Sequence, residues 1–309
     1  MSGKFKYHFV LQAIVLIWGL TGILGDYIKF DPQSSGHSMV ESIKVVFFRT
    51  AIAATSLFLI SFFVRNVQKI NFLQMIQLMG VGFIVAAHWF SFFYAIKVST
   101  VSIGVVCMAT MAFFTSLLEP LFLKRKVYAS EIFLSIFSLS GMALIFGFEF
   151  RYAEGIIWGL ICALLSTVFT IINSRLTRSY NAVTITRFEM LGATLSSAVV
   201  LLGIGEVKEG FMDIGAINWI YLLILGIVCT TVAFLAGVWV IRYVSPFTFG
   251  ISINLEPVYT ILIVLLIDYI QGTEKEKMTT GFYVGGLVIL AAVLLNAYVK
   301  HRMNEKSKA

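Results

Sequence analysis

The sequence predicts an all-α membrane protein with ten transmembrane helices, arranged as two inverted repeats of five helices. Composition is the first sign, because 59% of the 309 residues are hydrophobic and only 13% are charged, whereas a soluble domain carries about 25% charged residues. The second sign is a series of apolar runs, each near the roughly 20 residues that a helix needs to cross the hydrocarbon core. Because lipid offers the backbone no hydrogen-bond partner, runs of this length are expected to form helices.

The apolar runs are separated by short polar breaks, and each break marks where a helix is expected to leave the membrane. The weakest breaks are residues 98–99 and 243–245. The first run follows a basic segment, as in a signal peptide, but its length and the lack of a small-residue cleavage site predict a retained helix. The expected helices are residues 7–28, 42–64, 72–95, 99–123, 128–148, 155–174, 184–205, 217–241, 246–269 and 279–299.

Lysine and arginine are distributed unevenly between the two sides that ten helices define. Of the 23 basic residues, 14 fall on the side that holds both termini, 7 on the other side and 2 within helices. Because basic loops stay in the cytoplasm, we expect both termini there and the helices in the plasma (inner) membrane of a bacterium. A net charge of +7 also occurs in nucleic-acid-binding proteins. Basic residues scattered between apolar runs favour the lipid bilayer as partner instead, and no nucleic acid.

Two segments half a chain apart are alike. Residues 94–102 read YAIKVSTVS and residues 239–247 read WVIRYVSPF, and each follows a helix with a glycine near its start, Gly80 or Gly226. Five helices per half would make the second half enter the membrane with opposite polarity, as in transporters that use inverted repeats. We therefore expect a first repeat in residues 1–150 and a second in residues 151–309, which ends in a short basic tail. Similar composition of apolar helices is the alternative explanation.

Five short motifs, in this order and spacing, resemble the EamA-type transporters of the drug/metabolite transporter superfamily. They are Trp18-Gly19, Arg49, the segment 93–97, the pair of segments 225–226 and 230–234, and the segment 254–258. The resemblance covers residues 10–295. It implies ten helices in two inverted halves, with a central cavity lined mainly by helices one, three, four, six, eight and nine. It also implies transport of amino acids, nucleobases or similar metabolites, without an ATP site.

The chain departs from the family pattern in two places. Met111-Ala112 stand where the family often has proline in the fourth helix, and Glu119-Pro120 follow eight residues later, out of register with Glu256-Pro257. The Gly-Glu pair that usually follows the fourth and ninth helices is replaced by Lys124-Arg125 and Asp268-Tyr269.

Ionisable residues inside the predicted helices are the first candidates for function, because a charge at the bilayer centre costs about 2.5–3.5 kcal/mol on insertion scales. Arg49 could bind a substrate carboxylate, or it could clamp helix ends through its five donors. We favour the clamp, because the second helix is not among those implied to line the cavity. Glu119 is expected to pair with the basic residues 124–126. Glu189 lies near Arg187. These three, Arg49, Glu119 and Glu189, are interpreted as structural charges.

Glu256 is the deepest acid in the predicted topology. Pro257 removes one helical hydrogen bond and kinks the ninth helix, so a freed carbonyl, Asn254 and Glu256 lie within one turn. This group is expected to bind substrate, and the carboxyl group could exchange protons if transport is proton-coupled. A kink that serves only packing is the alternative.

Aromatic side chains and one histidine complete the expected binding site. Trp18, Trp89 and Trp239 lie on the first, third and eighth helices, and aromatic walls suit substrates with apolar or cationic parts. His88 and Phe92 are four residues apart and share a helix face. We expect all five to contact substrate, although histidine among aromatic residues is also compatible with simple packing.

No catalytic motif, metal-binding cluster or cofactor motif is recognisable in the sequence. The leading hypothesis is a secondary transporter that moves a small metabolite, an amino acid or similar, by alternating access, with export as the expected direction. The alternatives are a membrane-embedded sensor or assembly factor that binds a ligand without transporting it, and an intramembrane enzyme. Substrate identity, coupling ion and oligomeric state are not defined by the sequence.

Overall fold

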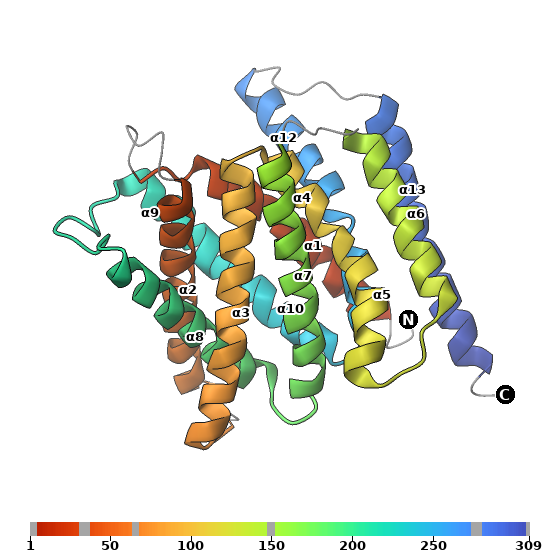
Figure 1. Cartoon of the computed structure of the whole chain (residues 1–309), viewed down its shortest axis with the longest axis horizontal. Coiled ribbons are helices and arrows are strands. Elements are labelled where there is room, and N and C mark those ends of the chain that lie inside the picture. The colour runs from red at the N-terminus through yellow and green to blue at the C-terminus, as the bar shows by residue number, and fades with distance from the viewer. Residues whose placement is uncertain (1–4, 31–37, 64–67, 147–151, 273–279, 307–309) are drawn as a thin grey trace.

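Every regular element is helical in the residues that the computed structural model describes, which are 5–30, 38–63, 68–146, 152–272 and 280–306. Figure 1 shows the helices running roughly alongside one another as a bundle. Their bounds are α1 Phe5–Tyr27, α2 Ser38–Phe63, α3 Phe72–Lys97, α4 Val101–Met108, α5 Thr110–Leu123, α6 Ala129–Phe146, α7 Ala153–Leu176, α8 Ala182–Gly203, α9 Ala216–Leu223, the π-helix η2 Ile224–Val232, α10 Ala233–Ile241, α11 Pro246–Ile253, α12 Glu256–Gln271 and α13 Thr280–Lys306.

Within these described residues, eight helical stretches are long and apolar enough to cross a membrane. They are Lys6–Tyr27, Ser38–Phe63, Phe72–Lys97, Val101–Leu123, Ala153–Leu176, Ala182–Gly203, Ala216–Ile241 and Pro246–Ile267. Ala129–Leu144 and Tyr283–Val299 are shorter apolar helices. Each of the ten stretches coincides with one expected helix, and the chain is a multi-pass membrane protein.

Local capping explains where several helices begin. Asn71 Oδ1 accepts a hydrogen bond from Gln74 N, and Gln74 Oε1 accepts one from Asn71 N, both at 2.9 Å. This capping box satisfies two of the donors that a helix start leaves free. Asn181 and Ser245 cap α8 and α11 in the same way through one side-chain oxygen each. The short polar breaks of the sequence therefore act as helix starts.

Two of the expected helices are broken near their middle, and the sequence predicted a kink in the second of them only. The expected helix 99–123 is interrupted at Ala109, and the expected helix 246–269 is interrupted at residues 254–255. Pro257 accounts for the second break, because it has no N–H to donate to Ile253. At the first break, Thr110 Oγ1 donates to Cys107 O at 2.6 Å, a local bond that competes with the helical pattern.

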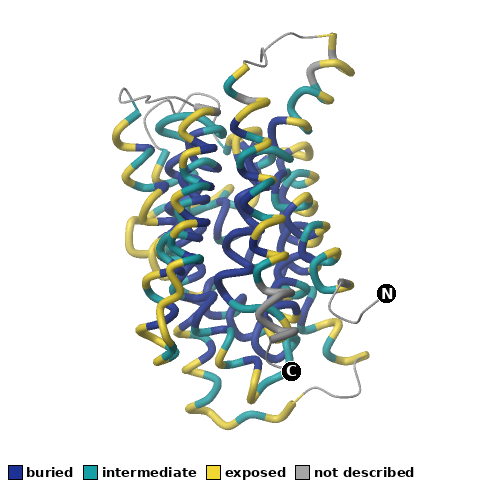
Figure 2. Tube along the Cα trace, turned by 90° about the vertical axis from the view of Figure 1, so that its right-hand side faces the viewer, coloured by how far each residue is buried: buried dark blue, intermediate teal, exposed yellow. Residues whose placement is uncertain are grey.

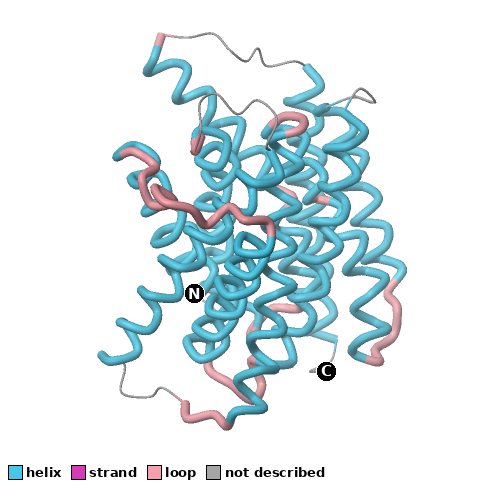
Figure 3. The backbone as a smooth tube through the Cα atoms, turned by 60° about the vertical axis from the view of Figure 1, so that its left-hand side comes forward, coloured by secondary structure: helices cyan, strands magenta, loops and turns pink. Residues whose placement is uncertain are grey.

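The buried residues form the middle of the bundle, and exposed residues lie along its outside (Figure 2). Many outward-facing side chains are large and apolar, such as Phe62 at 83% exposure and Phe63 at 86%, as expected where a surface meets lipid. Most loops lie toward the two ends of the bundle, and one long loop crosses its side (Figure 3).

Glycines allow two pairs of helices to pack closely. A Cβ atom on Gly82 of α3 would lie 2.1 Å from Glu189 O of α8, and one on Gly192 of α8 would lie 2.2 Å from Met79 O of α3. On the edge of the bundle, α6 and α13 lie side by side (Figure 1), and a Cβ on Gly141 would lie 2.9 Å from Gly285 O. Such close backbone approach is typical of membrane helices, where small residues form the interfaces.

Candidate functional site

A narrow cavity lies in the middle of the bundle, and the two broken helices form part of its wall. The centre of a water molecule can occupy about 50 Å³ of this cavity. One water needs roughly 10–15 Å³ on this measure, so the cavity in this conformation holds a few waters or a small ligand. Five of the residues expected to bind substrate line it, namely Trp18, His88, Trp89, Phe92 and Glu256.

Arg49 also lines the cavity, although the sequence favoured a purely structural role for it. Its side chain is 1% exposed, and Nε and NH2 both donate to Thr230 Oγ1, at 3.1 and 2.8 Å. The guanidinium carbon lies 4.0 Å from the centre of the Trp89 ring and 5.4 Å from that of Phe93. Cation–π contacts of this kind contribute about 2 kcal/mol when desolvated, which offsets part of the cost of burying the charge.

One guanidinium nitrogen of Arg49 remains unused. NH1 is buried and has no hydrogen-bond partner, and the ion pairs of the described residues do not include Arg49. A buried donor without a partner costs about 1–3 kcal/mol, more when charged. Arg49 is therefore partly held in place and partly available to an anionic group in the cavity.

The π-helix η2 positions both Arg49 and Trp18. In its wider turn, the Thr230 hydroxyl donates a hydrogen bond to the carbonyl of Leu225, five residues earlier, at 2.7 Å. The hydroxyl oxygen is then oriented to accept from Arg49. It also leaves Cys229 O to accept from Trp18 Nε1 at 3.1 Å. Isolated π-helical turns occur frequently at functional sites. Here the turn joins α1 and α2 to the same segment of the second half of the chain.

Glu256 is the first residue of α12 and contributes the acidic group of the cavity. Its side chain is 5% exposed, and none of the ion pairs of the described residues includes it. Arg49 and Glu256 thus line one cavity without pairing with each other. The cavity therefore presents one guanidinium group and one carboxyl group.

Asn254 lies outside the cavity lining and instead joins the two helix breaks. In the amide orientation that satisfies all of its neighbours, Oδ1 accepts from Ser138 Oγ at 2.6 Å, and Nδ2 donates to Ala109 O at 3.1 Å and Gly250 O at 3.3 Å. Ala109 is the break between α4 and α5. The Asn254 amide, at one helix break, therefore donates to the carbonyl of Ala109 at the other break. A carbonyl that leaves the helical pattern at membrane depth requires such a donor, because lipid offers none.

His88 is held by α7 in a defined orientation. Nδ1 lies 2.9 Å from Cys162 O, and because a carbonyl only accepts, Nδ1 carries the proton in this bond. The other nitrogen, Nε2, is then the acceptor of a neutral ring. Phe169 packs edge-on against His88, with ring centres 5.3 Å apart. His88 can thus accept a hydrogen bond from a ligand without carrying charge.

Sequence reasoning missed seven residues of the wall, mostly aromatic or small. They are Thr21, Met108, Ser166, Phe169, Phe234, Phe249 and Ile253. Phe249 meets Trp18 edge-on at 5.9 Å, and Phe234 meets Trp89 edge-on at 5.5 Å. Because phenylalanine is frequent throughout the chain, with 28 residues, composition gave no signal that these rings differ from ordinary packing residues.

Trp239 lies apart from the cavity. It is 36% exposed and packs with Tyr7 and Tyr243, at ring-centre distances of 5.4 and 5.2 Å. A tryptophan in an aromatic cluster near the end of a helix is typical of an anchor at the membrane interface.

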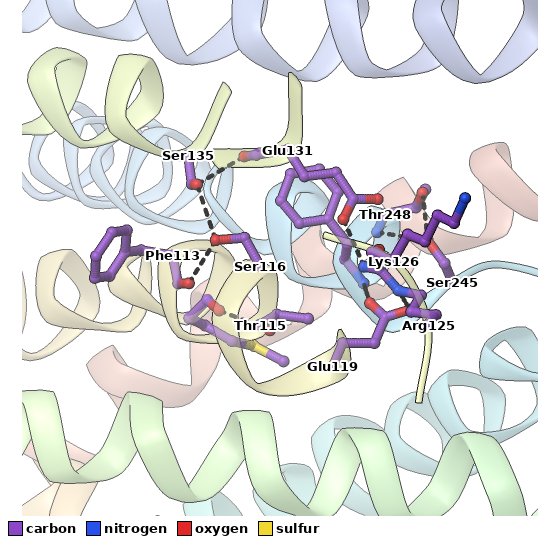
Figure 4. A network of polar contacts seen from close by, with 12 residues as sticks. Phe113, Thr115, Ser116, Glu119, Arg125, Lys126, Glu131, Ser135, Ser245 and Thr248 are labelled. Atoms are coloured by element: carbon purple, nitrogen blue, oxygen red, sulfur yellow. Dashed lines mark hydrogen bonds and ion pairs between the residues drawn. The ribbon is translucent and has the colours of Figure 1, made fainter. Parts of the chain in front are cut away.

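Glu119 belongs to a buried charge cluster at the end of α5 (Figure 4). The sequence predicted a pair with one of the basic residues 124–126, and Arg125 is that residue. The Glu119 carboxylate is 3% exposed; Oε1 accepts from Arg125 Nε and Oε2 from Phe247 N, both at 2.9 Å. Arg125 NH2 also pairs with Glu131 Oε2 at the start of α6, at 2.5 Å. Burial lowers the pKa of Arg125, but the two carboxylates outweigh it and raise the pKa overall. The cluster ties α5, α6 and α11 together.

Glu189 is fully buried on α8, away from the cavity, and is not part of an ion pair among the described residues. Arg187, the neighbour that the sequence suggested, lies over the rings of Phe58 and Phe188 instead. In the described parts of the chain there is no group of three or more His, Cys, Asp or Glu residues that could hold a metal ion.

The comparisons with known proteins agree with this architecture. The sequence model of the EamA-like transporter family matches residues 6–147 and again residues 153–298. The chain belongs to the EamA-like transporter family. This family is part of the drug/metabolite transporter superfamily, as the sequence motifs suggested, and the two matches are two repeats of the EamA unit. Membership makes membrane transport of a small solute the expected activity.

Solved structures support the fold of this EamA-like chain. Matches extend to 29 chains. One of them, described only as the crystal structure of a protein, is similar with a TM-score of 0.70 over 96% of this chain and 97% of that chain, at 13% sequence identity. At this identity the likeness concerns the fold alone. No curated protein sequence matches the chain.

Proposed function

We propose that this EamA-like protein is a secondary transporter of a small zwitterionic metabolite, such as an amino acid, and that it exports this solute across the bacterial inner membrane. The observation that carries the proposal is the pair of Arg49 and Glu256, which line one aromatic cavity without forming an ion pair. Arg49 would bind the carboxylate through its free NH1, and Glu256 would bind the ammonium group. The rings of Trp18, Trp89 and Phe249 would surround an apolar side chain.

Ten transmembrane helices in two inverted repeats, residues 1–150 and 151–309, would provide alternating access, with both termini in the cytoplasm. The helix breaks support this arrangement. Ala109 and Asn254 are 145 positions apart, and so are Lys97 and Arg242 of the two similar segments. Broken helices at equivalent positions of two halves are a feature of transporters with a binding site near the midplane.

Counterflow in proteoliposomes tests the proposal. Vesicles holding the purified protein are loaded with one unlabelled L-amino acid, and uptake of the same radiolabelled amino acid is measured, across the twenty proteinogenic amino acids. At least one should exchange, whereas its decarboxylated amine and its deaminated acid should not. Exchange of organic cations or anions, with none of an amino acid, would contradict the zwitterionic substrate class.

Two further outcomes separate the rival functions. A sensor or assembly factor would show ligand-induced thermal stabilisation without any counterflow. An intramembrane enzyme would convert its substrate in detergent, where no compartments exist. We favour transport because both repeats match the EamA-like transporter family and residues of both line the central cavity.

A further inference from the structure

Buried polar atoms without a hydrogen-bond partner are concentrated on α7 and α8. Of the ten such side-chain atoms in the described residues, eight belong to these two helices. They are Thr170 Oγ1, Asn173 Oδ1 and Nδ2, Thr184 Oγ1, Thr186 Oγ1, Arg187 Nε, and Glu189 Oε1 and Oε2. A buried polar group without a partner destabilises the folded chain, so a cluster of this size requires an explanation.

The α7 members of the cluster continue a polar stripe that starts in the cavity. Ser166 lines the cavity, and Thr170, Asn173 and Thr177 follow it at steps of four, three and four residues, which keep them on one face of the helix. All four side chains are at most 3% exposed. At 1.5 Å per residue, the stripe leads about 16 Å along the helix, to the end of α7 beside the basic residues Arg175 and Arg178.

Glu189 faces this stripe from α8. Asn173 is the polar side chain that lies against its carboxylate, yet neither group has a hydrogen bond of normal geometry. Both helices pack against α3, where the backbones of Gly82 and Glu189 are in close contact. Glu189 is thus enclosed among α3, α7 and α8, opposite the stripe.

The kinds of unsatisfied atoms indicate what would fill the site. A bare cation would satisfy only the oxygens, namely those of Glu189, Asn173 and Thr170. Asn173 Nδ2 is a donor that faces the Glu189 carboxylate, and a partner that both donates and accepts would satisfy it together with the oxygens. Water and a zwitterionic solute have this property. Polar groups aligned along one helix face, of which Thr170 and Asn173 have no hydrogen-bond partner, are expected of a water-filled passage that is closed in this conformation.

We infer that the α7 stripe and Glu189 form the closed half of the transport route, a hydrophilic passage from the cavity to the Arg175–Arg178 end of the bundle. The inference rests on the proposed function. Glu189 and Asn173 are the second binding site on this route, where the carboxylate takes the ammonium group of the solute and the amide takes its carboxylate. Neither residue lines the central cavity.

Thiol accessibility tests the passage directly. Asn173→Cys and Ile171→Cys are made in the full chain and exposed in vesicles to a membrane-impermeant methanethiosulfonate, with peptide mass spectrometry reading each position separately. Both positions are fully buried at nearly the same depth, but only Asn173 lies on the stripe. The thiol of the Asn173→Cys variant should react at least about tenfold faster, since thiolate chemistry needs water. Equal rates, or no reaction of this thiol in vesicles that show counterflow, would overturn the inference.

A leucine variant at the same position provides an independent test. Asn173→Leu removes a buried amide that has no hydrogen bond of normal geometry, so the unfolding temperature should equal or exceed that of the wild-type protein. Counterflow should fall at least about tenfold, because the amide can no longer bind the solute carboxylate; a tenfold change is about 1.4 kcal/mol. Unchanged counterflow, or a clear fall in the unfolding temperature, would count against the passage. If wild-type protein shows no counterflow but the thiol of Asn173→Cys reacts, the passage stands and the proposed function fails.

Discussion

Replacing Arg125 with methionine would remove the cation that two buried acids share. The side chains of Glu119 and Glu131 are 3% and 4% exposed, and that of Arg125 is 21% exposed. Without Arg125, the Glu119 carboxylate would keep only the Phe247 N–H among its partners in the described residues. Breaking a buried ion pair by removing one member costs about 3–5 kcal/mol. Because Arg125 is partly exposed, we expect a loss near the lower figure, about 3 kcal/mol.

The unfolding temperature measures this loss. Cys107, Cys162 and Cys229 are all buried, so a fluorogenic thiol reagent reports unfolding without a new label. A loss of about 3 kcal/mol corresponds to a decrease of roughly 5 °C, at about 2.1 cal/mol/K of unfolding entropy per residue over 309 residues. The scan uses one heating rate because unfolding is commonly irreversible. Arg125→Met combined with Glu119→Gln should regain part of the loss, since the unpaired charge is then gone.

Arg178→Met is the matched control, because Arg178 is an exposed basic residue in another loop at the same end of the bundle. It should shift the unfolding temperature by less than about 2 °C, as surface substitutions usually do. If Arg125→Met and Arg178→Met gave equal shifts, the reasoning that the Glu119 cluster ties α5, α6 and α11 together would be refuted.

Three further variants give distinct expectations. Asn254→Leu should lower the free energy of unfolding by about 1–3 kcal/mol, because Ala109 O and Gly250 O lose their donor. An unchanged unfolding temperature would contradict the conclusion that Asn254 joins the two helix breaks. Gly82→Ala should destabilise by about 1–3 kcal/mol through its contact with Glu189 O, whereas Gly80→Ala, with nothing within 4 Å, should be neutral or stabilising. Glu256→Gln removes the proposed partner of the ammonium group, so counterflow should fall at least about tenfold, and because Gln cannot exchange protons, the remaining flux should not respond to an imposed pH gradient; gradient-driven flux at the wild-type level excludes Glu256 both as ammonium ligand and as proton carrier.

The sequence was most informative about the helices. Apolar runs bounded by polar breaks predicted the position of each helix to within a few residues, because membrane thickness and backbone hydrogen bonding together leave few alternatives. Proline at position 257 also predicted the kink of the ninth helix. The break at Ala109 has no comparable sequence signal, because it depends on Thr110 and on the distant amide of Asn254.

The candidate site was only partly predictable, because cavity residues are defined by helix rotation. Trp18, His88 and Glu256 were recognisable as polar or large groups deep within helices. Arg49 could be recognised as a buried charge, but its position in the cavity depends on Thr230, 181 residues away, which lies on a π-helix that the sequence did not reveal. Trp239 has the same residue type as Trp18 but lies two residues before the end of its expected helix, a position that already favoured an interface anchor.

The most direct test of the account compares counterflow by wild-type protein, Arg49→Lys and Arg49→Gln, using an amino acid that exchanges and its decarboxylated amine. Losing a hydrogen bond to a charged group costs about 1.5–3 kcal/mol, or roughly tenfold to a hundredfold in exchange. Arg49→Gln should therefore lose exchange of the amino acid by at least about tenfold and no longer discriminate against the amine, while Arg49→Lys retains part of the activity. Wild-type exchange by Arg49→Gln, with the amine still rejected, would contradict the claim that Arg49 and Glu256 form a zwitterion-binding cavity.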